Sequence, residues 1–253
     1  QRKMSETIIK MINELYKEYL LYGGYPRVVI EKNEGKKKEI LKNIYNTYLL
    51  REIKEILQIE EDEKVNRVIK AFALQIGAVI NFNEISSLTN IDFHQLKRYI
   101  EVLKKTFVCF ESRPYFKNKR KELAKAPKVY FLDNGFRNVA INNFQNLNER
   151  SDFGSLNENF VASELFKKEF KINYWRTKAC AEVDFVIERK GKILPIEVKT
   201  SIKSIKYTKS FRSFLNTYKP ERGILLSQEF LKRTNLDNTK IIFAPTFLVS
   251  KLI

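Results

Sequence analysis

Two runs of alternating apolar and charged residues, joined by Lys190-Gly191, constrain the fold of this chain more than any other feature. The runs cover residues 182–188 and 193–199 and have the period of two residues that is typical of β-strands. A glycine-containing pair between two such runs predicts a hairpin with a tight turn. Because the turn fixes the register, it also determines which side chains of the two strands oppose each other.

The register of this hairpin brings charged side chains together. Asp184 is expected to face Glu197, and Glu182 to face Lys199, all on one side of the hairpin. Directly opposed acids destabilise a strand pair, so they need a compensating cation. A divalent metal bound by their oxygens is one interpretation, with Lys199 orienting a metal-bound water or stabilising charge on a phosphate. A solvent-facing cluster of salt bridges is the other.

The composition narrows the choice of metal and of compartment. His94 is the single histidine, which excludes a zinc site built from several histidines and leaves little room for Ser-His-Asp chemistry. Oxygen ligands favour Mg²⁺ or Mn²⁺, and no other cofactor is expected. Cys109 and Cys180 are too few for a disulfide framework. With no apolar membrane span and no signal-peptide core, the expectation is a cytoplasmic protein without membrane contact.

The net charge of +17 is unevenly distributed along the chain. Residues 1–63 contain 12 basic and 12 acidic side chains, residues 64–152 contain 16 and 8, and residues 153–253 contain 19 and 10. The whole surplus therefore lies after residue 63. A positive field of this kind attracts polyanions, so DNA is the expected partner. A lysine-rich, merely solvated surface is the alternative.

The first part of the chain has helical spacing. Helices are expected over residues 5–22, 36–58 and 64–77, with a boundary at the acidic run that ends at residue 63. Residues 83–88 form a short helix for which Asn83 is the expected cap, and Asp92 is expected to cap a longer helix after a turn. This is a helix-turn-helix pattern, and its second helix exposes Lys97 and Arg98 to a nucleic acid.

A basic segment follows the second helix. It lies between expected strands at residues 107–113 and 128–132, so the pattern predicts a winged helix over residues 64–150 with a basic hairpin as its wing. DNA contact and protein docking are both open uses of such a module. If the module binds DNA, the wing residues in contact with it are Lys117, Lys119, Arg120, Lys121 and Lys125.

Residues 151–253 form a separate α/β domain in this interpretation. A helix over residues 156–170 is followed by three strands, a helix over residues 205–218 and two further strands. Trp175, the only tryptophan, either stacks on a base or, more commonly for a residue beside a sheet, packs in the core.

Asp184 followed by Glu197-Val198-Lys199 resembles the D…(D/E)xK signature of the PD-(D/E)xK nuclease superfamily. The order helix, three strands, helix, strand is also similar to the core of that superfamily, so a restriction-endonuclease-like fold is expected. The resemblance implies that Asp184 and Glu197 bind the metal and that Lys199 is catalytic. It further implies that Glu158, in the helix that leads the domain, is an additional acid near the metal.

A wider resemblance covers most of residues 20–226. Six motifs carry it, in this order: LYGGYPRVV, the helix-turn-helix, KAPKVYFLDNGF, GSLNENFVASEL, NYWRTKACAEVDFVI and LPIEVKTS. Together they resemble the C-terminal half of a family of archaeal and bacterial AAA-type ATPases. In that family a P-loop ATPase module precedes this region, and the relatives form rings, which implies homo-oligomers. This chain starts at Gln1 and contains no GxxxxGK[ST] motif. It is therefore expected to be a fragment without ATPase activity of its own, with residues 1–63 as a lid-like remnant of the ATPase region.

Two functions follow from these patterns. The first is a Mg²⁺- or Mn²⁺-dependent DNA endonuclease module coupled to an ATPase. The second is a catalytically silent module that binds DNA or protein on a nuclease fold.

Overall fold

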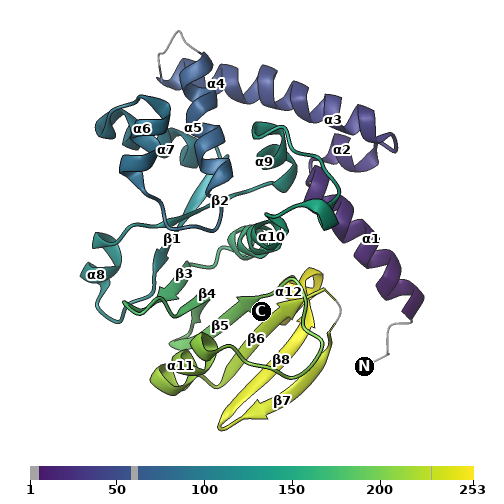
Figure 1. Cartoon of the computed structure of the whole chain (residues 1–253), viewed down its shortest axis with the longest axis vertical. Helices are drawn as coiled ribbons and strands as arrows, with labels where there is room; N and C mark the ends of the chain where they lie inside the picture. Colours follow the sequence, from purple (N-terminus) through teal and green to yellow (C-terminus); the bar gives the residue numbers. More distant parts are fainter. Residues whose placement is uncertain (1–5, 58–61, 229) are drawn as a thin grey trace. The chain divides into compact units, whose positions relative to one another are not determined.

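The computed structural model describes residues 6–57, 62–228 and 230–253 (Figure 1). Over these residues the chain is a mixed α/β protein that divides into two compact units. The helical unit contains Glu14–Glu111 and Lys128–Arg150, and the sheet unit contains Ser112–Pro127, Ser151–Ile253 and the start of the first helix, through Asn13. No helix in the described part of the chain is long and apolar enough to cross a membrane.

The helices of the first part follow the expected spacing. The first one ends where Gly23 adopts a φ of +74°, a left-handed value that favours glycine. The helix predicted over residues 36–58 is formed by α3, a π-helical segment η1 and α4. The predicted boundary in the acidic run falls partly outside the described residues. The elements of the helical unit, apart from the helix-turn-helix and the strands, are α1 (Glu6–Tyr22), α2 (Pro26–Ile30), α3 (Glu34–Asn43), η1 (Ile44–Leu49), α4 (Leu50–Leu57), α5 (Asp62–Leu74), α9 (Asn134–Ala140) and the 3-10 turn η2 (Leu147–Glu149).

Two helices around a tight turn are present where the helix-turn-helix was predicted, α6 (Phe82–Thr89) and α7 (Phe93–Lys105). Asp92 caps α7 as predicted, because its carboxylate accepts the backbone N–H groups of His94 and Gln95 at 2.9 and 3.1 Å. The buried side of α7 carries the four apolar residues that share a face in the sequence, Leu96, Tyr99, Ile100 and Leu103.

The predicted cap of α6 is wrong. Asn83 lies inside the first turn, whereas Asn81 precedes the helix and accepts the backbone N–H of Glu84 at 3.3 Å. An N-cap side chain must lie before the first helical residue to reach these unpaired N–H groups. The helix therefore begins at Phe82, earlier than its run of apolar residues indicated.

The two strands predicted after α7 are β1 (Cys109–Pro114) and β2 (Lys128–Phe131), which are neighbours in the sheet. The connection between them was predicted to be a basic hairpin, and this is wrong, because it contains the helix α8 (Lys119–Ala124). Asn118 caps α8 by accepting the backbone N–H of Arg120 at 3.0 Å. The sequence KRKELA consists of residues with high helix propensity, which explains why a helix replaces the loop.

The sheet unit contains the order helix, three strands, helix, strand that the sequence predicted. The strand β7 and the short helices after β8 were not predicted. Its elements are α10 (Phe153–Lys167), β3 (Ile172–Arg176), β4 (Glu182–Arg189), β5 (Lys192–Val198), α11 (Lys209–Tyr218), β6 (Arg222–Ser227), β7 (Lys232–Leu236), β8 (Thr239–Pro245), η3 (Thr246–Leu248) and α12 (Val249–Leu252). Along the hydrogen-bonded ladders the order of the described strands is β2-β1-β3-β4-β5-β6-β8-β7, a mixed eight-stranded sheet.

The predicted hairpin of β4 and β5 is confirmed. Lys190 and Gly191 form its turn with φ values of +51° and +73°, the left-handed pair that a two-residue hairpin loop requires. The Cα pairs run from Arg189 opposite Lys192 to Phe185 opposite Ile196, which is the predicted register.

One face of this sheet packs against α11 through an apolar core. Trp175 is 6% exposed and meets Phe214 of α11 edge to face, with ring centroids 5.3 Å apart. This confirms the core interpretation of the tryptophan.

A β-bulge interrupts β4 at Asp184. On the β3 side, Asn173 pairs with Val186 while Trp175 pairs with Val183, so Asp184 and Phe185 together oppose the single residue between them. The sequence pattern did not predict this bulge. Bulges change the direction of side chains and are frequent beside functional sites.

Candidate functional site

The candidate acids lie at one edge of the sheet because of the strand directions. β1, β3, β5, β6 and β8 run the same way, and β4 and β7 run against them. Asp184 lies near the beginning of β4 and Glu197 near the end of β5, so both are at the edge where the parallel strands end. Lys199 follows β5 directly. Ligands commonly bind at this edge of open α/β sheets.

Hydrogen bonds fix both carboxylates. The Oδ2 atom of Asp184 accepts the backbone N–H of Val198 at 2.7 Å. The two oxygens of Glu197 have separate partners, since Oε1 lies 2.8 Å from the Lys199 ammonium and Oε2 accepts the hydroxyl of Thr208 at 3.0 Å. The structure therefore brings together the three residues that the sequence singled out.

The cluster joins a buried carboxylate, Glu197, to a partly exposed ammonium group, Lys199. Glu197 is only 2% exposed, and this burial raises its pKa, with the negative charge of Asp184 adding to the effect against the opposing influence of Lys199. The pKa of Lys199 is also raised, because attraction to Asp184, Glu197 and Glu158 exceeds the opposing effect of burial. Perturbed groups of this kind concentrate at functional sites, although structural ion pairs show them as well.

Glu158, the acid proposed from the resemblance alone, lies on α10, which contacts β5. Its charge acts on Lys199, which places it in the same electrostatic environment as Asp184 and Glu197. The start of α10 also comes close to the end of β5, since a Cβ added to Gly154 would lie 3.7 Å from a methyl group of Thr200.

Glu182 does not have the partner that the hairpin register predicted for it. Its Oε2 atom lies 3.7 Å from the guanidinium of Arg176, the residue opposite it on β3. The β4–β5 pairs extend only as far as Phe185 and Ile196, and Lys199 lies beyond the end of β5. The predicted pairing of Glu182 with Lys199 is therefore corrected: Lys199 pairs with Glu197.

Among the described residues, no three or more His, Cys, Asp or Glu side chains form a group arranged to hold a metal ion. The donor set at the edge nevertheless suits a hard cation, because Asp184 and Glu197 are interacting carboxylates and carboxylate oxygens are the ligands that such cations prefer. Mg²⁺ commonly uses one or two carboxylates and keeps several waters.

The basic segment predicted as a wing is attached to the sheet unit. Glu122 of α8 is 2% exposed, pairs with Lys171 and Lys119, and accepts the side-chain amide of Asn173 on β3 at 3.2 Å. The hydroxyl of Tyr174 donates to the carbonyl of Ala126 at 2.9 Å. Because this segment leaves the sheet at the end of β1, it begins at the same edge as the acid cluster.

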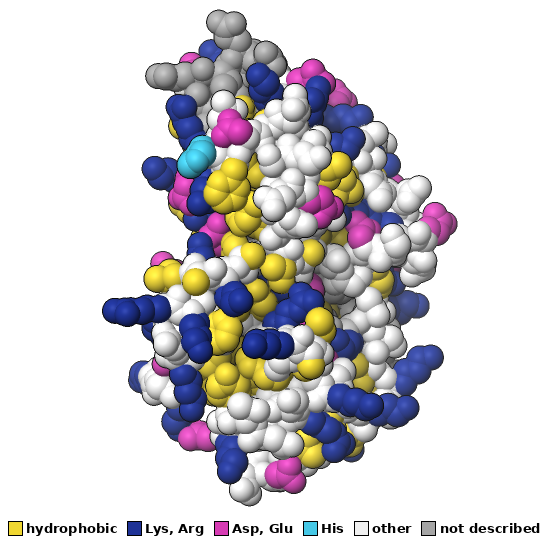
Figure 2. Space-filling model, turned by 60° about the vertical axis from the view of Figure 1, so that its left-hand side comes forward, with side chains coloured by type: hydrophobic (Ala, Val, Ile, Leu, Met, Phe, Trp, Pro, Cys, Tyr) yellow, Lys and Arg dark blue, Asp and Glu magenta, His cyan; other side chains and the backbone are white. Residues whose placement is uncertain are grey.

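The predicted DNA-contacting residues of this segment are all exposed: Lys117, Lys119, Arg120, Lys121 and Lys125. Further basic residues follow β3 and β5 at the same edge, among them Lys178 and Lys203. In Figure 2 the left-hand side of Figure 1, which carries α8 and α11, is turned toward the viewer. On this face Lys and Arg side chains surround apolar ones. The acids therefore lie at the edge of the sheet from which these basic segments extend.

Lys97 and Arg98 are exposed on α7, in the helical unit. The ammonium of Lys97 lies 4.4 Å from the centre of the Phe93 ring, a cation–π contact. These two residues thus belong to the other unit and are not part of the acid cluster.

The sequence did not predict two residues of the site, Thr208 and Arg176. Thr208 caps α11 by accepting the backbone N–H of Phe211 at 3.0 Å, and the same hydroxyl donates to Glu197. Because of this cap, α11 begins at Lys209 and not at residue 205 as predicted. A threonine before a helix is a recognisable cap signal, whereas the contact of Arg176 with Glu182 depends on the pairing of β3 with β4.

The N-terminal part of the chain, residues 13–147, matches the family model DUF8612, described as a domain of unknown function, over just more than half of the chain. The chain belongs to the DUF8612 family. Residues 153–247, which contain the acid cluster, match a second model, DUF4143, also described as a domain of unknown function.

Proteins similar to this DUF8612 member occur in bacteria and archaea. An uncharacterized protein of Haemophilus influenzae is 24% identical over 246 residues, which cover 95% of this chain and 59% of the relative. An uncharacterized protein of Methanocaldococcus jannaschii is 26% identical over 242 residues, 92% of this chain and 49% of the relative. One of Mycobacterium tuberculosis is 29% identical over 144 residues, 55% of this chain and 32% of the relative. The chain thus spans at most about three fifths of these relatives.

Proposed function

We propose that this chain is a DNA-binding module with a divalent-metal-dependent endonuclease site of the PD-(D/E)xK kind. One observation carries the proposal: Asp184, Glu197 and Lys199 gather at the sheet edge from which the exposed basic segments extend. Acids that bind a metal beside cations that bind phosphates are the components of phosphodiester hydrolysis.

Asp184 and Glu197 are the residues that would hold Mg²⁺ or Mn²⁺, with Glu158 as a third acid close by. When bound, the metal would supply a water of lowered pKa and neutralise charge on the phosphate. The chain's own contribution is positional. Val198 and Thr208 hold the two carboxylates by hydrogen bonds, and Lys199 places a positive charge beside them that can stabilise a phosphate oxygen.

DNA binding is assigned chiefly to the segment around α8. Its exposed cations neutralise phosphates, which fixes the position of the duplex without reading its sequence. α6 and α7 with β1 and β2 correspond to a winged helix in which α8 takes the place of the wing loop, and Lys97 and Arg98 are its second set of DNA contacts. The predicted domain boundaries near residues 63 and 150 are part of this proposal.

The wider protein is proposed to be an AAA-type ATPase of which this chain is the C-terminal region. The incomplete coverage of the relatives from Haemophilus influenzae and Methanocaldococcus jannaschii leaves room for a further module in such proteins. Assembly into homo-oligomers would come from that module.

Incubation with branched, single-stranded and duplex DNA in the presence of Mn²⁺ tests the nuclease proposal. The informative variant is Asp184→Asn, because an asparagine oxygen can still accept the N–H of Val198 while the negative charge is removed. Asp237→Asn is the matched control, since Asp237 is an exposed turn residue with a left-handed φ of +51°, which asparagine tolerates.

Cleavage by the wild type and by Asp237→Asn, with loss of cleavage in Asp184→Asn, is the expected result. Cleavage that persists unchanged in Asp184→Asn would assign the activity to another site or to a contaminant.

A specific contact favours the second candidate, a catalytically silent module that binds DNA. The ammonium of Lys199 already lies 2.8 Å from Glu197, so a cation is present where the buried carboxylate needs one. Binding that is steeply salt-dependent, without cleavage in either Mg²⁺ or Mn²⁺, would favour this role. Salt-independent binding of a protein partner would favour docking instead.

A further inference from the structure

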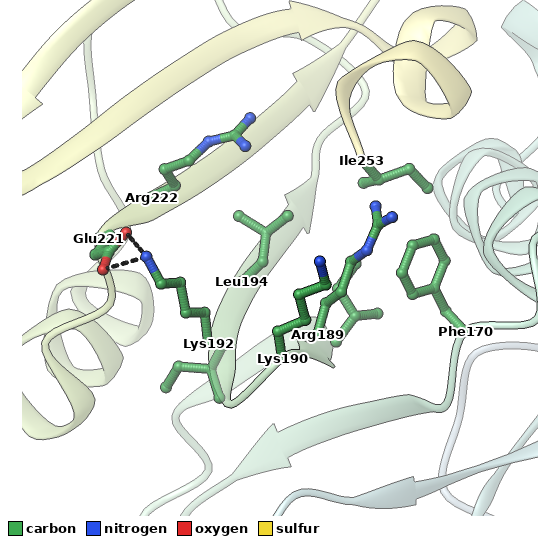
Figure 3. Close-up of a pocket in the computed structure, with 10 residues that line it drawn as sticks. Phe170, Arg189, Lys190, Lys192, Leu194, Glu221, Arg222 and Ile253 are labelled. Carbon is green, nitrogen blue, oxygen red and sulfur yellow. Dashed lines mark hydrogen bonds and ion pairs between the residues drawn. The ribbon is translucent and has the colours of Figure 1, made fainter.

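A cavity lies at the edge of the same sheet opposite the acid cluster, where β5 and β6 begin. It has a volume of about 350 Å³, which falls within the range of small-molecule sites. The hairpin turn, the residue before β6 and the chain after α10 surround it (Figure 3). Its apolar lining is supplied by Phe170, Ile187, Ile193, Leu194 and Ile253.

The charged side chains that line this cavity are those of four basic residues and one acidic residue, Glu221. Lys192 is neutralised by Glu221, with an ion pair at 2.8 Å. The side chains of Arg189 and Lys190, in contrast, make no ion pair or hydrogen bond with the described part of the chain. Figure 3 shows these two side chains extending side by side toward Ile253, with Phe170 next to Arg189.

We propose that this cavity binds a small amphipathic anion with an aliphatic body and a carboxylate or phosphate head. Apolar side chains take up the body, since burial of each methylene removes apolar surface from water. Arg189 presents a planar fork that matches the head group in a bidentate manner, and Lys190 adds a second charge. These two cations, which have no partner among the described residues, therefore lie beside the apolar lining where such a head group would be held.

The lining also argues against a nucleotide as the ligand. Apart from the charged residues, every side chain that lines the cavity is apolar. A base exposes donors and acceptors along its edge, and burying them without partners is unfavourable. An aliphatic body has no such groups, so it fits this lining better.

This inference does not rest on the proposed nuclease function. The cavity is at the edge where the parallel strands begin, and the acid cluster is at the edge where they end. Anion binding in the cavity and DNA cleavage at the acid cluster can therefore be measured independently, and failure to observe one does not affect the test of the other.

Isothermal titration calorimetry with octanoate, octyl phosphate, butanoate and octanol tests the proposal. Saturable binding of octanoate or octyl phosphate is expected at one site per chain. Each methylene between butanoate and octanoate should strengthen binding by about threefold to fourfold if the body is buried. The stronger of the two octyl anions identifies the preferred head group.

Variants distinguish the contribution of the anionic head group to binding affinity from that of the aliphatic body. The double variant Arg189→Gln/Lys190→Gln should weaken octanoate binding about tenfold or more and leave octanol binding unchanged. Leu194→Gln should weaken both. The matched control is Lys232→Gln/Arg233→Gln, which removes an adjacent lysine and arginine from the exposed strand β7.

The proposal is overturned if neither octyl anion binds saturably. It is also overturned if octanol binds as tightly as octanoate, because the cations would then have no role. Equal weakening by the control variant would show an effect of net charge and not of this cavity.

Discussion

Replacing Lys119, Arg120 and Lys121 with alanine is expected to weaken DNA binding broadly across sequences and to flatten its salt dependence. All three side chains are exposed on α8, so each can neutralise a phosphate. Removing one cation from a phosphate of duplex DNA lowers the slope of log K against log salt by about 0.9. Three such cations give an expected reduction of about two to three, nearer two if Lys119, which lies 3.4 Å from Glu122, contributes less than a full contact.

The corresponding change in affinity is large enough to measure. When salt is raised from about 50 to about 200 mM, the wild type should lose roughly 15- to 60-fold more affinity than the variant, because its slope is steeper by two to three. Alanine has the highest helix propensity, and Asn118 and Glu122 still cap and anchor the helix. The variant should therefore fold as the wild type does.

Fluorescence anisotropy of labelled duplex DNA, titrated at several salt concentrations, is the assay. The control variant replaces Lys32, Lys36 and Lys42, which are exposed in the part of the chain whose charges balance, and so has the same change in net charge. If the α8 variant keeps the wild-type slope, or if the control flattens the slope equally, the assignment of α8 to DNA is refuted. Docking on an acidic partner would then best explain the positive charge of residues 64–152.

Three further predictions concern the site and the fold. Asp184→Asn should leave DNA affinity in the same assay unchanged or raise it, because a negative charge is removed from a basic edge. The raised pKa of Glu197 means that its contribution to stability is present below the ordinary value of 4.5 and is lost as pH rises through the folded-state pKa. Thermal melts should therefore show Glu197→Gln at least as stable as the wild type at neutral pH, and this difference should disappear below about pH 4. Gly135→Ala should cost about 1–3 kcal/mol in denaturant titration, because the new Cβ would lie 2.1 Å from the carbonyl oxygen of Tyr22.

The parts of the fold that depend on local signals were predictable from the sequence. The turn at Lys190-Gly191 and the alternation on either side of it determined the register of β4 and β5, and with it the proximity of Asp184 and Glu197. Capping by Asp92 was likewise predictable, because a cap acts only on the N–H groups directly after it.

Features that depend on distant segments were not predictable. The bulge at Asp184 exists because β4 pairs with β3 in two registers, and no pattern within β4 encodes it. The position of α8 depends on Glu122 meeting Lys171 and Asn173, some fifty residues away in the chain. The predicted pairing of Glu182 failed for a similar reason, because the neighbouring strand β3 places Arg176 beside Glu182 while Lys199 pairs with Glu197.

An anomalous difference map from crystals soaked in Mn²⁺ would show whether the acid cluster binds a metal. We expect a peak between the carboxylates of Asp184 and Glu197, at about 2.0–2.3 Å from an oxygen of each, with the Lys199 ammonium moved away from Glu197. A map without a peak at these carboxylates, with Lys199 still paired to Glu197 at high Mn²⁺ concentration, would contradict this expectation.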